Sequence, residues 1–421
     1  MKQYSLLENK IAKGFFFVYL SAMLFLSRDT LFSSCIVGFQ KSQLLMFALI
    51  GVLGIWFLFR NRKNLKSILT DRRMIAFAVS AAVLLIPMLV KQDWQLMYFS
   101  ILLCLLFAVF LTYFTESSHV AKYYVVILCL IGFYSVIATY GLRELAQAGR
   151  IAPRVFYNSN GWDFFDFGFT YVVTWEYWHR NFGIFREPGV YQFFVLLALY
   201  LNNYSVRWDK NWVMWACNVI LVITMISTFA IGGFIELALF AVFLFLDKKY
   251  YRQKWGRIAA AAVVLAVLGI LGYGVYVYIY ETFELTIFYE LYDMCIRLFT
   301  KSESSTDRLN AILTNLKLMT EHPLIGNSIA AVLHGTTHNT SSTLLLYAIL
   351  GIVGGTVNVA AWIALAWKRE RSLIGNLILL LILFMSFNTQ NLVANVFFWL
   401  FPMMALVERG LPLIKGSGKK E

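Results

Sequence analysis

The sequence predicts an all-α integral membrane protein with about 12 transmembrane helices. Of its 421 residues, 60% are hydrophobic and only 14% are charged, and the mean hydropathy is +0.68. A soluble domain of this length needs more charge to cover its surface. Apolar runs of about 17–23 residues also recur along the chain, and this is the length that crosses a bilayer as a helix.

The expected spans are distributed over the whole chain, which we treat as a single polytopic domain, 1–421. The first run lacks a small-residue cleavage site, so we expect a retained span and not a signal peptide. The five cysteines are scattered and have no metal spacing, and we expect neither a disulfide framework nor a metal site. The predicted spans are 11–27, 42–59, 74–90, 95–114, 121–140, 188–203, 212–230, 233–246, 258–280, 341–366, 373–389 and 392–408.

The distribution of Lys and Arg predicts that both termini are cytoplasmic. With this orientation, 24 of the 36 basic residues lie on the cytoplasmic side, as the positive-inside rule requires. The formal net charge of +13 is thereby explained by topology, and we expect no nucleic-acid partner.

Two connections are much longer than the others, and both fall on the predicted outer side. They cover residues 141–187 and 281–340 and are neither low in complexity nor rich in Gly and Ser. Connections of this length that are not linkers are usually functional loops.

Arginines are concentrated in these two outer loops, against the topological preference. The first loop contains Arg150, Arg154 and Arg186, and the second contains Arg308. A guanidinium group binds phosphate oxygens through two parallel hydrogen bonds and never loses its charge. We therefore expect a diphosphate ligand, although ion pairs with the many acidic residues of the same loops are an alternative for each arginine taken singly.

The stretch GIFREPGVYQ places Arg186 and Glu187 at the start of the span that begins with Pro188. Proline suits the first helical position, and an acidic residue suits the positive end of a helix. Arg186 is not explained by capping. The sequence leaves two partners open for Arg186, namely Glu187 and a lipid diphosphate, and we expect the diphosphate.

The first outer loop is rich in aromatic residues, among them Trp162 and Trp175. Aromatic faces stack on sugar rings, but they also form belts at the membrane interface. Both interpretations stay open. Asn158 to Gly161 is a turn signal.

The second outer loop contains a predicted surface helix near 306–321. Leucine or isoleucine occurs at 309, 312, 313 and 316, which gives one apolar face at helical spacing. The helix is too short and polar to span, so we expect it to lie on the membrane surface with Arg308 in its first turn. It should end at His322-Pro323.

Histidine placement suggests acid–base chemistry and not a metal centre. His338 lies just ahead of a span, and the spacing HGTTH is that of a loop, not of a helical metal-binding pair. An imidazole near neutral pH can act as general acid or base. Glu236, an ionisable group inside a predicted span, is a further functional candidate.

The order and sidedness of these motifs resemble those of the O-antigen polymerase and O-antigen ligase superfamily. The similar features are Arg186-Glu187-Pro188 at a span entrance, Arg308 opening a surface helix that closes with HPLIG, His338-Asn339, and Gly351 to Gly354 in the next span. The segment SFNTQNLVANVFFWLFP also resembles the last pair of spans of that family.

The resemblance implies a bacterial cytoplasmic (inner) membrane enzyme that transfers glycans from undecaprenyl diphosphate without metal or nucleotide cofactors. It assigns Arg186, Glu187 and His338 to catalysis. Arg308 would hold the donor diphosphate, with Arg150, Arg154, His322, Trp162 and Trp175 contributing to substrate binding. The expected activity is the polymerisation of lipid-linked oligosaccharide repeat units into a capsule, O-antigen or exopolysaccharide.

Two other functions stay open on the same sequence. A ligase of this superfamily would transfer the finished glycan to a different acceptor. A flippase for lipid-linked oligosaccharide would be expected to show two similar halves and broken helices at mid-membrane, and no convincing half-repeat is visible. A polymerase would be expected to work with a flippase and a chain-length regulator.

Overall fold

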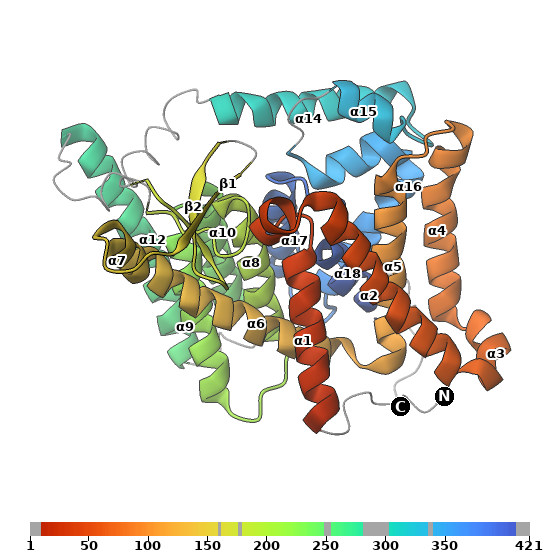
Figure 1. Cartoon of the computed structure of the whole chain (residues 1–421), viewed down its shortest axis with the longest axis horizontal. Coiled ribbons are helices and arrows are strands. Elements are labelled where there is room, and N and C mark those ends of the chain that lie inside the picture. The colour runs from red at the N-terminus through yellow and green to blue at the C-terminus, as the bar shows by residue number, and fades with distance from the viewer. Residues whose placement is uncertain are drawn as a thin grey trace.

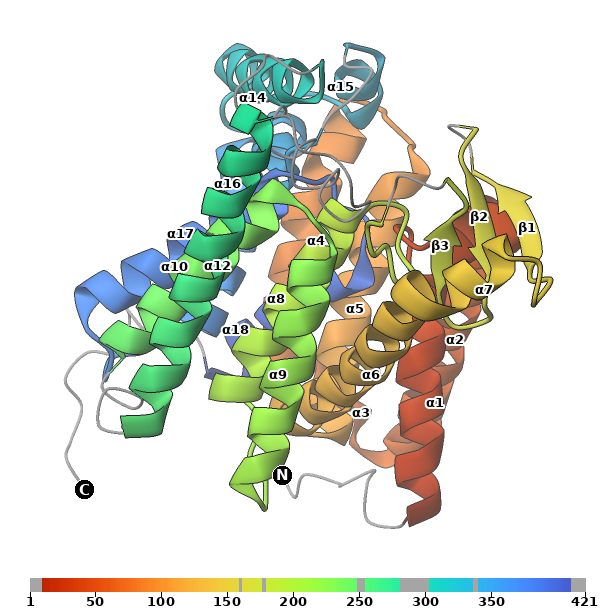
Figure 2. The same cartoon turned by 90° about the vertical axis from the view of Figure 1, so that its left-hand side faces the viewer.

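Long helices that run between two opposite faces form the body of the protein. The computed structural model describes residues 10–158, 161–175, 179–247, 254–280, 303–335 and 340–409. Helix α1 starts and helix α18 ends at one face, here named the terminal face (Figure 1). The opposite face carries α14 and α15 and is named the loop face (Figures 1 and 2).

The helices are as follows: α1 Lys10–Leu26, α2 Phe39–Arg60, α3 Leu65–Leu69, α4 Arg72–Val90, α5 Leu96–Phe114, α6 Ser117–Ile137, α7 Arg143–Gln147, α8 Pro188–Tyr204, α9 Asn211–Ser227, α10 Ile231–Leu246, α12 Lys254–Tyr280, α14 Glu303–Glu321, α15 Ile329–Gly335, α16 Ser342–Ala366, α17 Leu373–Asn388 and α18 Val396–Arg409. Short π-helical segments cover Phe32–Ile36 and Ala138–Leu142, and Arg62–Asn64 forms a 3₁₀ turn.

The apolar helices identify a membrane-embedded helical protein. Among the described residues, five helical stretches are long and apolar enough to cross a bilayer, namely Phe39–Arg60, Arg72–Val90, Leu96–Phe114, Ser117–Gln147 and Ser342–Ala366. Several shorter apolar helices accompany them. A helix overlaps each of the predicted spans, but a count of twelve crossings stays a prediction.

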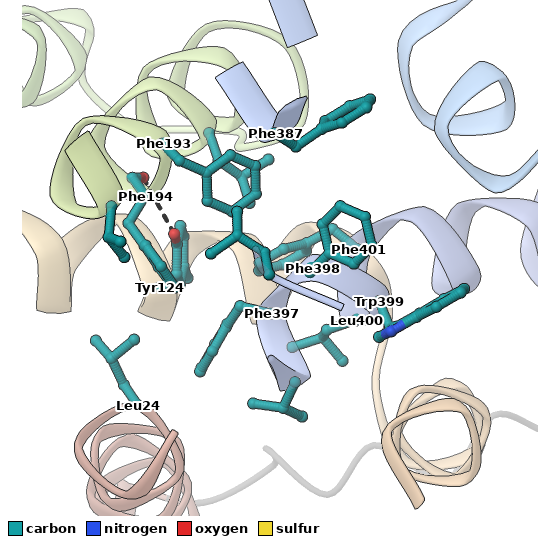
Figure 3. Packing of buried hydrophobic residues seen from close by; sticks show 14 of the residues in the cluster. Leu24, Tyr124, Phe193, Phe194, Phe387, Phe397, Phe398, Trp399, Leu400 and Phe401 are labelled. Carbon is teal, nitrogen blue, oxygen red and sulfur yellow. Dashed lines mark hydrogen bonds between the residues drawn. The ribbon is translucent and has the colours of Figure 1, made fainter. Parts of the chain in front are cut away.

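Helix α8 lies at the centre of the bundle. Its residues from 190 to 203 are all buried, so it packs on every side against other helices. Aromatic side chains from α18 fill the space between α8 and α6 (Figure 3). There the Tyr124 hydroxyl of α6 donates a hydrogen bond of 3.1 Å to the carbonyl of Phe194, and the ring of Phe397 stacks on Tyr124 at 5.3 Å. Such close packing is what holds helices together where no water is present to drive association.

The first large loop contains a small antiparallel sheet, which the all-α prediction did not include. Strand β1 covers Arg154–Tyr157, β2 covers Asp163–Asp166 and β3 covers Tyr171–Val173, in the order β1-β2-β3. Phe156 lies opposite Phe164 in the register, and their rings stack at 5.7 Å. The alternation of aromatic with polar residues in this stretch is typical of a strand with one buried face. This stretch therefore forms strands, although the segments before and after it are helical.

Helix α14 runs across the loop face, crosswise to the long helices below it (Figure 1). It begins at Glu303, so Arg308 lies in its second turn and not in its first. Its leucines Leu309, Leu313 and Leu316 are exposed, whereas Ala311 on another side is buried. The predicted apolar face therefore points away from the protein, and its contact with a membrane surface stays a prediction.

Helix α16 is broken at Gly351, and the segment after α14 is inserted at the break. Gly351 has φ 68° and ψ −171°, a conformation open almost only to glycine. The backbone N–H of Ile352 donates to the carbonyl of Pro323 at 2.7 Å, and the N–H of Asn327 donates to the carbonyl of Ala348 at 2.8 Å. The inserted backbone thus replaces hydrogen bonds that the helix loses at the kink.

Candidate functional site

The chain that leads into α8 is fixed by a tight contact with the helix itself. Gly183 has φ +55°, and a Cβ atom there would lie 2.6 Å from the ring of Tyr191. The side-chain oxygen of Asn181 accepts a hydrogen bond of 2.9 Å from the N–H of Gly183. Only glycine allows this backbone to pass so close to the aromatic ring. The position of the following residues, including Arg186, is therefore set by the first turns of α8.

The short connection after α1 lies alongside this segment. Thr30 and Phe185 form an antiparallel bridge, and the N–H of Arg186 donates to the carbonyl of Asp29 at 3.0 Å. These backbone contacts bring residues that are far apart in the sequence to one point above α8.

Asp29 is the buried acid at the centre of the resulting cluster. Its side chain is only 2% exposed, and its Oδ1 lies 3.5 Å from Nε of Arg186. Its Oδ2 accepts a hydrogen bond of 2.9 Å from Nδ2 of Asn395. The amide oxygen of Asn395 accepts from the N–H of Phe397 at 3.0 Å, which fixes the orientation of the amide. A buried carboxylate needs such partners.

A second arginine, Arg28, precedes Asp29 in the chain and lies close enough to Asp29 and Arg186 for their charges to interact. Its guanidinium lies 5.0 Å from the centre of the Phe39 ring. Burial lowers the pKa of Arg28, the charge of Asp29 acts in the opposite direction, and the charge of Arg186 lowers this pKa further. The charge of Asp29 thus favours the charged form of Arg28, while the same carboxylate pairs with Arg186.

Arg186 presents part of its guanidinium to the surface. Its side chain is 40% exposed, although its Nε is buried. Among the described residues, no side chain other than Asp29 pairs with it. The two terminal nitrogens form the accessible side of the fork, the geometry that binds two oxygens of a phosphate.

Glu187 is the residue before the first turn of α8, and its backbone is extended there (φ −147°, ψ 146°). Its side chain makes no capping hydrogen bond. It is partly exposed, and within the described ranges it forms no ion pair with Arg186. Of the two partners that the sequence left open for Arg186, Glu187 is thus not the one observed, and the acid found there is Asp29.

The loop between α17 and α18 packs against the start of α8 and contributes Asn395 to the site. A Cβ atom on Gly189 would lie 2.5 Å from Nε2 of Gln390, so this loop packs directly against the first turn of α8. The same loop is tied to the start of α16, where the Ser341 hydroxyl donates to Oδ1 of Asn388 at 2.7 Å. Asn395 is therefore held rigidly beside Asp29.

The other predicted arginines lie apart from this cluster. Arg150 and Arg154 are exposed in the first large loop, and Arg154 lies opposite Asp166 in the sheet. Arg308 is partly buried on α14. No hydrogen bond or ion pair between the described residues joins any of the three to Arg186. Their predicted part in substrate binding stays a prediction.

The remaining predicted residues are also separate from Arg186. Trp162 and Trp175 make an edge-to-face contact at 6.2 Å, and Trp175 is 42% exposed, so this pair offers an aromatic surface beside the sheet. His322 is exposed at the end of α14. His338 lies outside the described residues, and its catalytic role stays a prediction.

Arg28, Asp29 and Asn395 are site residues that sequence reasoning did not select. Asp29 stands out in the sequence as an acid directly after an arginine in a short outer connection. The sequence alone does not pair Asp29 with Arg186, because Arg186 lies more than 150 residues further along the chain and no local pattern links the two positions.

A comparison of the chain with protein-family models, curated proteins and solved structures gave no significant match. Arg186, with its accessible fork, lies just before the positive end of the buried helix α8, and such an arrangement binds anions. Glu187 beside it is a carboxylate that can accept a proton. No group of three or more metal-binding side chains occurs among the described residues.

Proposed function

We propose that the protein polymerises oligosaccharide repeat units linked to undecaprenyl diphosphate, on the outer face of the bacterial cytoplasmic membrane. In this proposal the loop face is outside and both termini are cytoplasmic. The observation that carries it is Arg186, which pairs with the buried carboxylate of Asp29 through Nε and keeps the rest of its guanidinium accessible, with the charge of Arg28 nearby. Such a cluster at the membrane edge suits a diphosphate whose lipid tail stays in the bilayer.

The reaction needs only groups that the substrates and the chain supply. A hydroxyl of the acceptor repeat unit attacks the anomeric carbon of the donor glycan. The bond between that carbon and the diphosphate breaks, and undecaprenyl diphosphate leaves with the electron pair. Arg186, assisted by Arg28, stabilises the charge on the leaving diphosphate. The acceptor proton goes to Glu187 or to His338.

The test uses purified protein and a lipid-linked repeat unit from the producing cell, with no nucleotide added. Wild type should give a ladder of products on a gel. Arg186→Ala should lower the rate by about 100-fold or more, which is the usual effect of removing one preorganised donor to a developing negative charge. Arg186→Lys should recover little, because a point charge does not replace the fork.

The matched control is Lys41→Ala, because Lys41 is an exposed cation at the start of α2 on the same face. A ladder of normal length from the Arg186→Ala protein would refute the proposal. Transfer of glycan only to a different acceptor would indicate a ligase instead.

A flippase for the same lipid-linked unit is the second candidate, and one observation favours it. Glu236 of α10 is fully buried, and its Oε1 lies 3.4 Å from Nε2 of Gln192 on α8. Ionisable groups inside a span are common along transport pathways. Movement of lipid-linked units across vesicle membranes without any ladder, and its loss in Glu236→Gln, would favour transport over polymerisation.

A further inference from the structure

The terminal face contains a large polar cavity that the proposed reaction does not use. Its volume is about 1460 Å³, which is above the range of about 300–1,000 Å³ that is usual for small-molecule pockets. Its walls come from the starts of α4 and α6 and from the ends of α5, α8, α16 and α18. Cavities where many elements converge are the usual positions of ligand sites.

Basic side chains dominate the charged lining of this cavity. Six Lys or Arg residues line it, against four acids, and all ten come from the described part of the chain. The basic residues are Arg72, Arg73, Lys122, Arg207, Lys368 and Arg409, and the acids are Asp71, Glu116, Asp209 and Glu408.

Two of the acids are already bound by groups of the protein. The carboxylate of Asp71 caps α4 and accepts from Arg73, with Oδ2 3.1 Å from Nη2. Burial acts to raise the pKa of Asp71, but the hydrogen bonds from Arg73 outweigh it and lower this pKa. Glu408 accepts from the N–H of Ser117 at 3.1 Å and from its hydroxyl at 2.6 Å. Because Asp71 and Glu408 are hydrogen-bonded to Arg73 and Ser117, among the described residues they do not pair with the other cations of the cavity.

The other two acids compensate little of the remaining charge. Asp209 lies 3.9 Å from Lys122, but its side chain is 96% exposed, so water screens the pair. The side chain of Glu116 is exposed and accepts from the Ser118 hydroxyl at 3.3 Å.

Arg207 and Arg409 are the cations best placed to receive a ligand. Both are exposed and line the cavity. Within the described ranges neither side chain has a hydrogen bond or an ion pair. They come from the α8–α9 connection and from the end of α18, so the fold, and not a local run of basic residues, brings them to one cavity.

We infer that this cavity is a binding site for a phosphate-bearing anion, held by Arg207 and Arg409. A guanidinium fork matches phosphate geometry, and the size of the cavity admits a group larger than a single phosphate. The anion can be the headgroup of an anionic lipid at the membrane edge or a soluble phosphate compound. Binding does not depend on the proposed polymerase activity.

The experiment measures binding to purified, detergent-solubilised full-length protein in two arms. The soluble arm titrates inorganic pyrophosphate, and the lipid arm titrates dioctanoyl phosphatidylglycerol with dioctanoyl phosphatidylcholine as its neutral reference. Removing one charge-assisted hydrogen-bonding partner weakens binding by about ten-fold or more. We therefore expect Arg207→Gln and Arg409→Gln each to weaken it about ten-fold and the double variant about 100-fold.

The matched control is the double variant Arg62→Gln/Lys66→Gln. Both residues are exposed cations near the α2–α4 connection, and neither lines the cavity. If pyrophosphate binds and only the cavity variants weaken this binding, the ligand is a soluble phosphate compound. If only the anionic lipid binds, and only the cavity variants weaken its binding, the cavity is a lipid headgroup site. Absence of binding in both arms would overturn the inference. An equal loss of affinity in the control variant would also overturn it, because the anion would then be attracted by the surface charge in general and not by the cavity.

All variants are surface substitutions that leave the core intact, and their elution on size-exclusion chromatography confirms folding. A variant that elutes as aggregate is replaced by the charge-retaining Arg207→Lys/Arg409→Lys pair. That pair should retain the general attraction for anions but bind several-fold more weakly than wild type, because lysine lacks the fork. Binding by the lysine pair equal to wild type would refute the assigned role of the two guanidinium groups.

Discussion

Replacing Gly351 with alanine should destabilise the protein severely, because this residue is where the segment after α14 enters the broken helix α16. A Cβ atom at Gly351 would lie 2.2 Å from the carbonyl oxygen of Leu324 and 2.5 Å from the nitrogen of Gly326. Ordinary contacts of this kind begin at 3.4 Å. The two backbones would have to separate by roughly 1 Å, because neither is the flexible end of a side chain.

The cost follows from the contacts that such a shift breaks. The hydrogen bonds from Ile352 to Pro323 (2.7 Å) and from Asn327 to Ala348 (2.8 Å) cross this junction. A buried group left without its partner costs about 1–3 kcal/mol, and a non-glycine residue in this region of φ and ψ adds about 1–3 kcal/mol. With two such groups unpaired, these losses come to about 3–9 kcal/mol, and after a gain of about 0.4–1 kcal/mol from the stiffer unfolded chain the net loss is about 2–9 kcal/mol.

Thermal unfolding of the purified protein in detergent, followed by tryptophan fluorescence, measures this loss. One kcal/mol moves Tm by about 2–4 °C in a domain of 150–250 residues and by less in a larger chain, so Gly351→Ala should lower Tm by roughly 3 °C or more. The control is Gly51→Ala in α2, where a Cβ atom meets nothing within 4 Å and alanine favours the helix.

Gly326→Ala provides an internal check. Its Cβ would lie 2.4 Å from the nitrogen of Gly351, so it opens the same junction. The double variant Gly326→Ala/Gly351→Ala should therefore lose less than the sum of the two single losses. A Tm for Gly351→Ala equal to that of Gly51→Ala would refute the view that the two backbones are in tight contact.

Three further predictions concern charged groups. Asp29→Ala removes the acid that pairs with Arg186 and Asn395. Because Asp29 is buried, we expect a loss of about 3 kcal/mol by thermal unfolding, and an unchanged Tm would contradict the assigned geometry. Glu236→Gln keeps the shape of the group beside Gln192 and should stay within about 1 kcal/mol of wild type, while Glu236→Ala leaves a buried amide without its partner and should lose about 1–3 kcal/mol. The pKa of Asp71 is lowered below the usual aspartate value of 3.8, so its charged form stabilises the folded protein above about pH 4, and this stability is lost as the pH falls through the lowered pKa. In Asp71→Asn, Tm should therefore fall less steeply with pH below about pH 4 than in wild type. Equal dependence of Tm on pH in the two proteins at acid pH would exclude this contribution.

Local sequence features predicted several elements well. The span predicted at 188–203 begins where α8 begins, because Pro188 fits the first helical position and cannot continue a helix backwards. The predicted stop at His322-Pro323 matches the end of α14 at Glu321. The sheet in the first loop was missed, since its strands are too short to outweigh the overall apolar and aromatic character of the chain.

Hydrophobicity and local chemistry by themselves determined that this is a helical membrane protein, where several helices begin and end, and that arginines gather in the long loops. Those properties depend on runs of neighbouring residues. Only the tertiary structure decided that Asp29 is the partner of Arg186, that Arg207 and Arg409 line one cavity, and that Gly351 receives the backbone of the Pro323 segment. These contacts join segments far apart in the chain, and only helix packing determines which distant groups meet, because the pairing carries no local periodic signal.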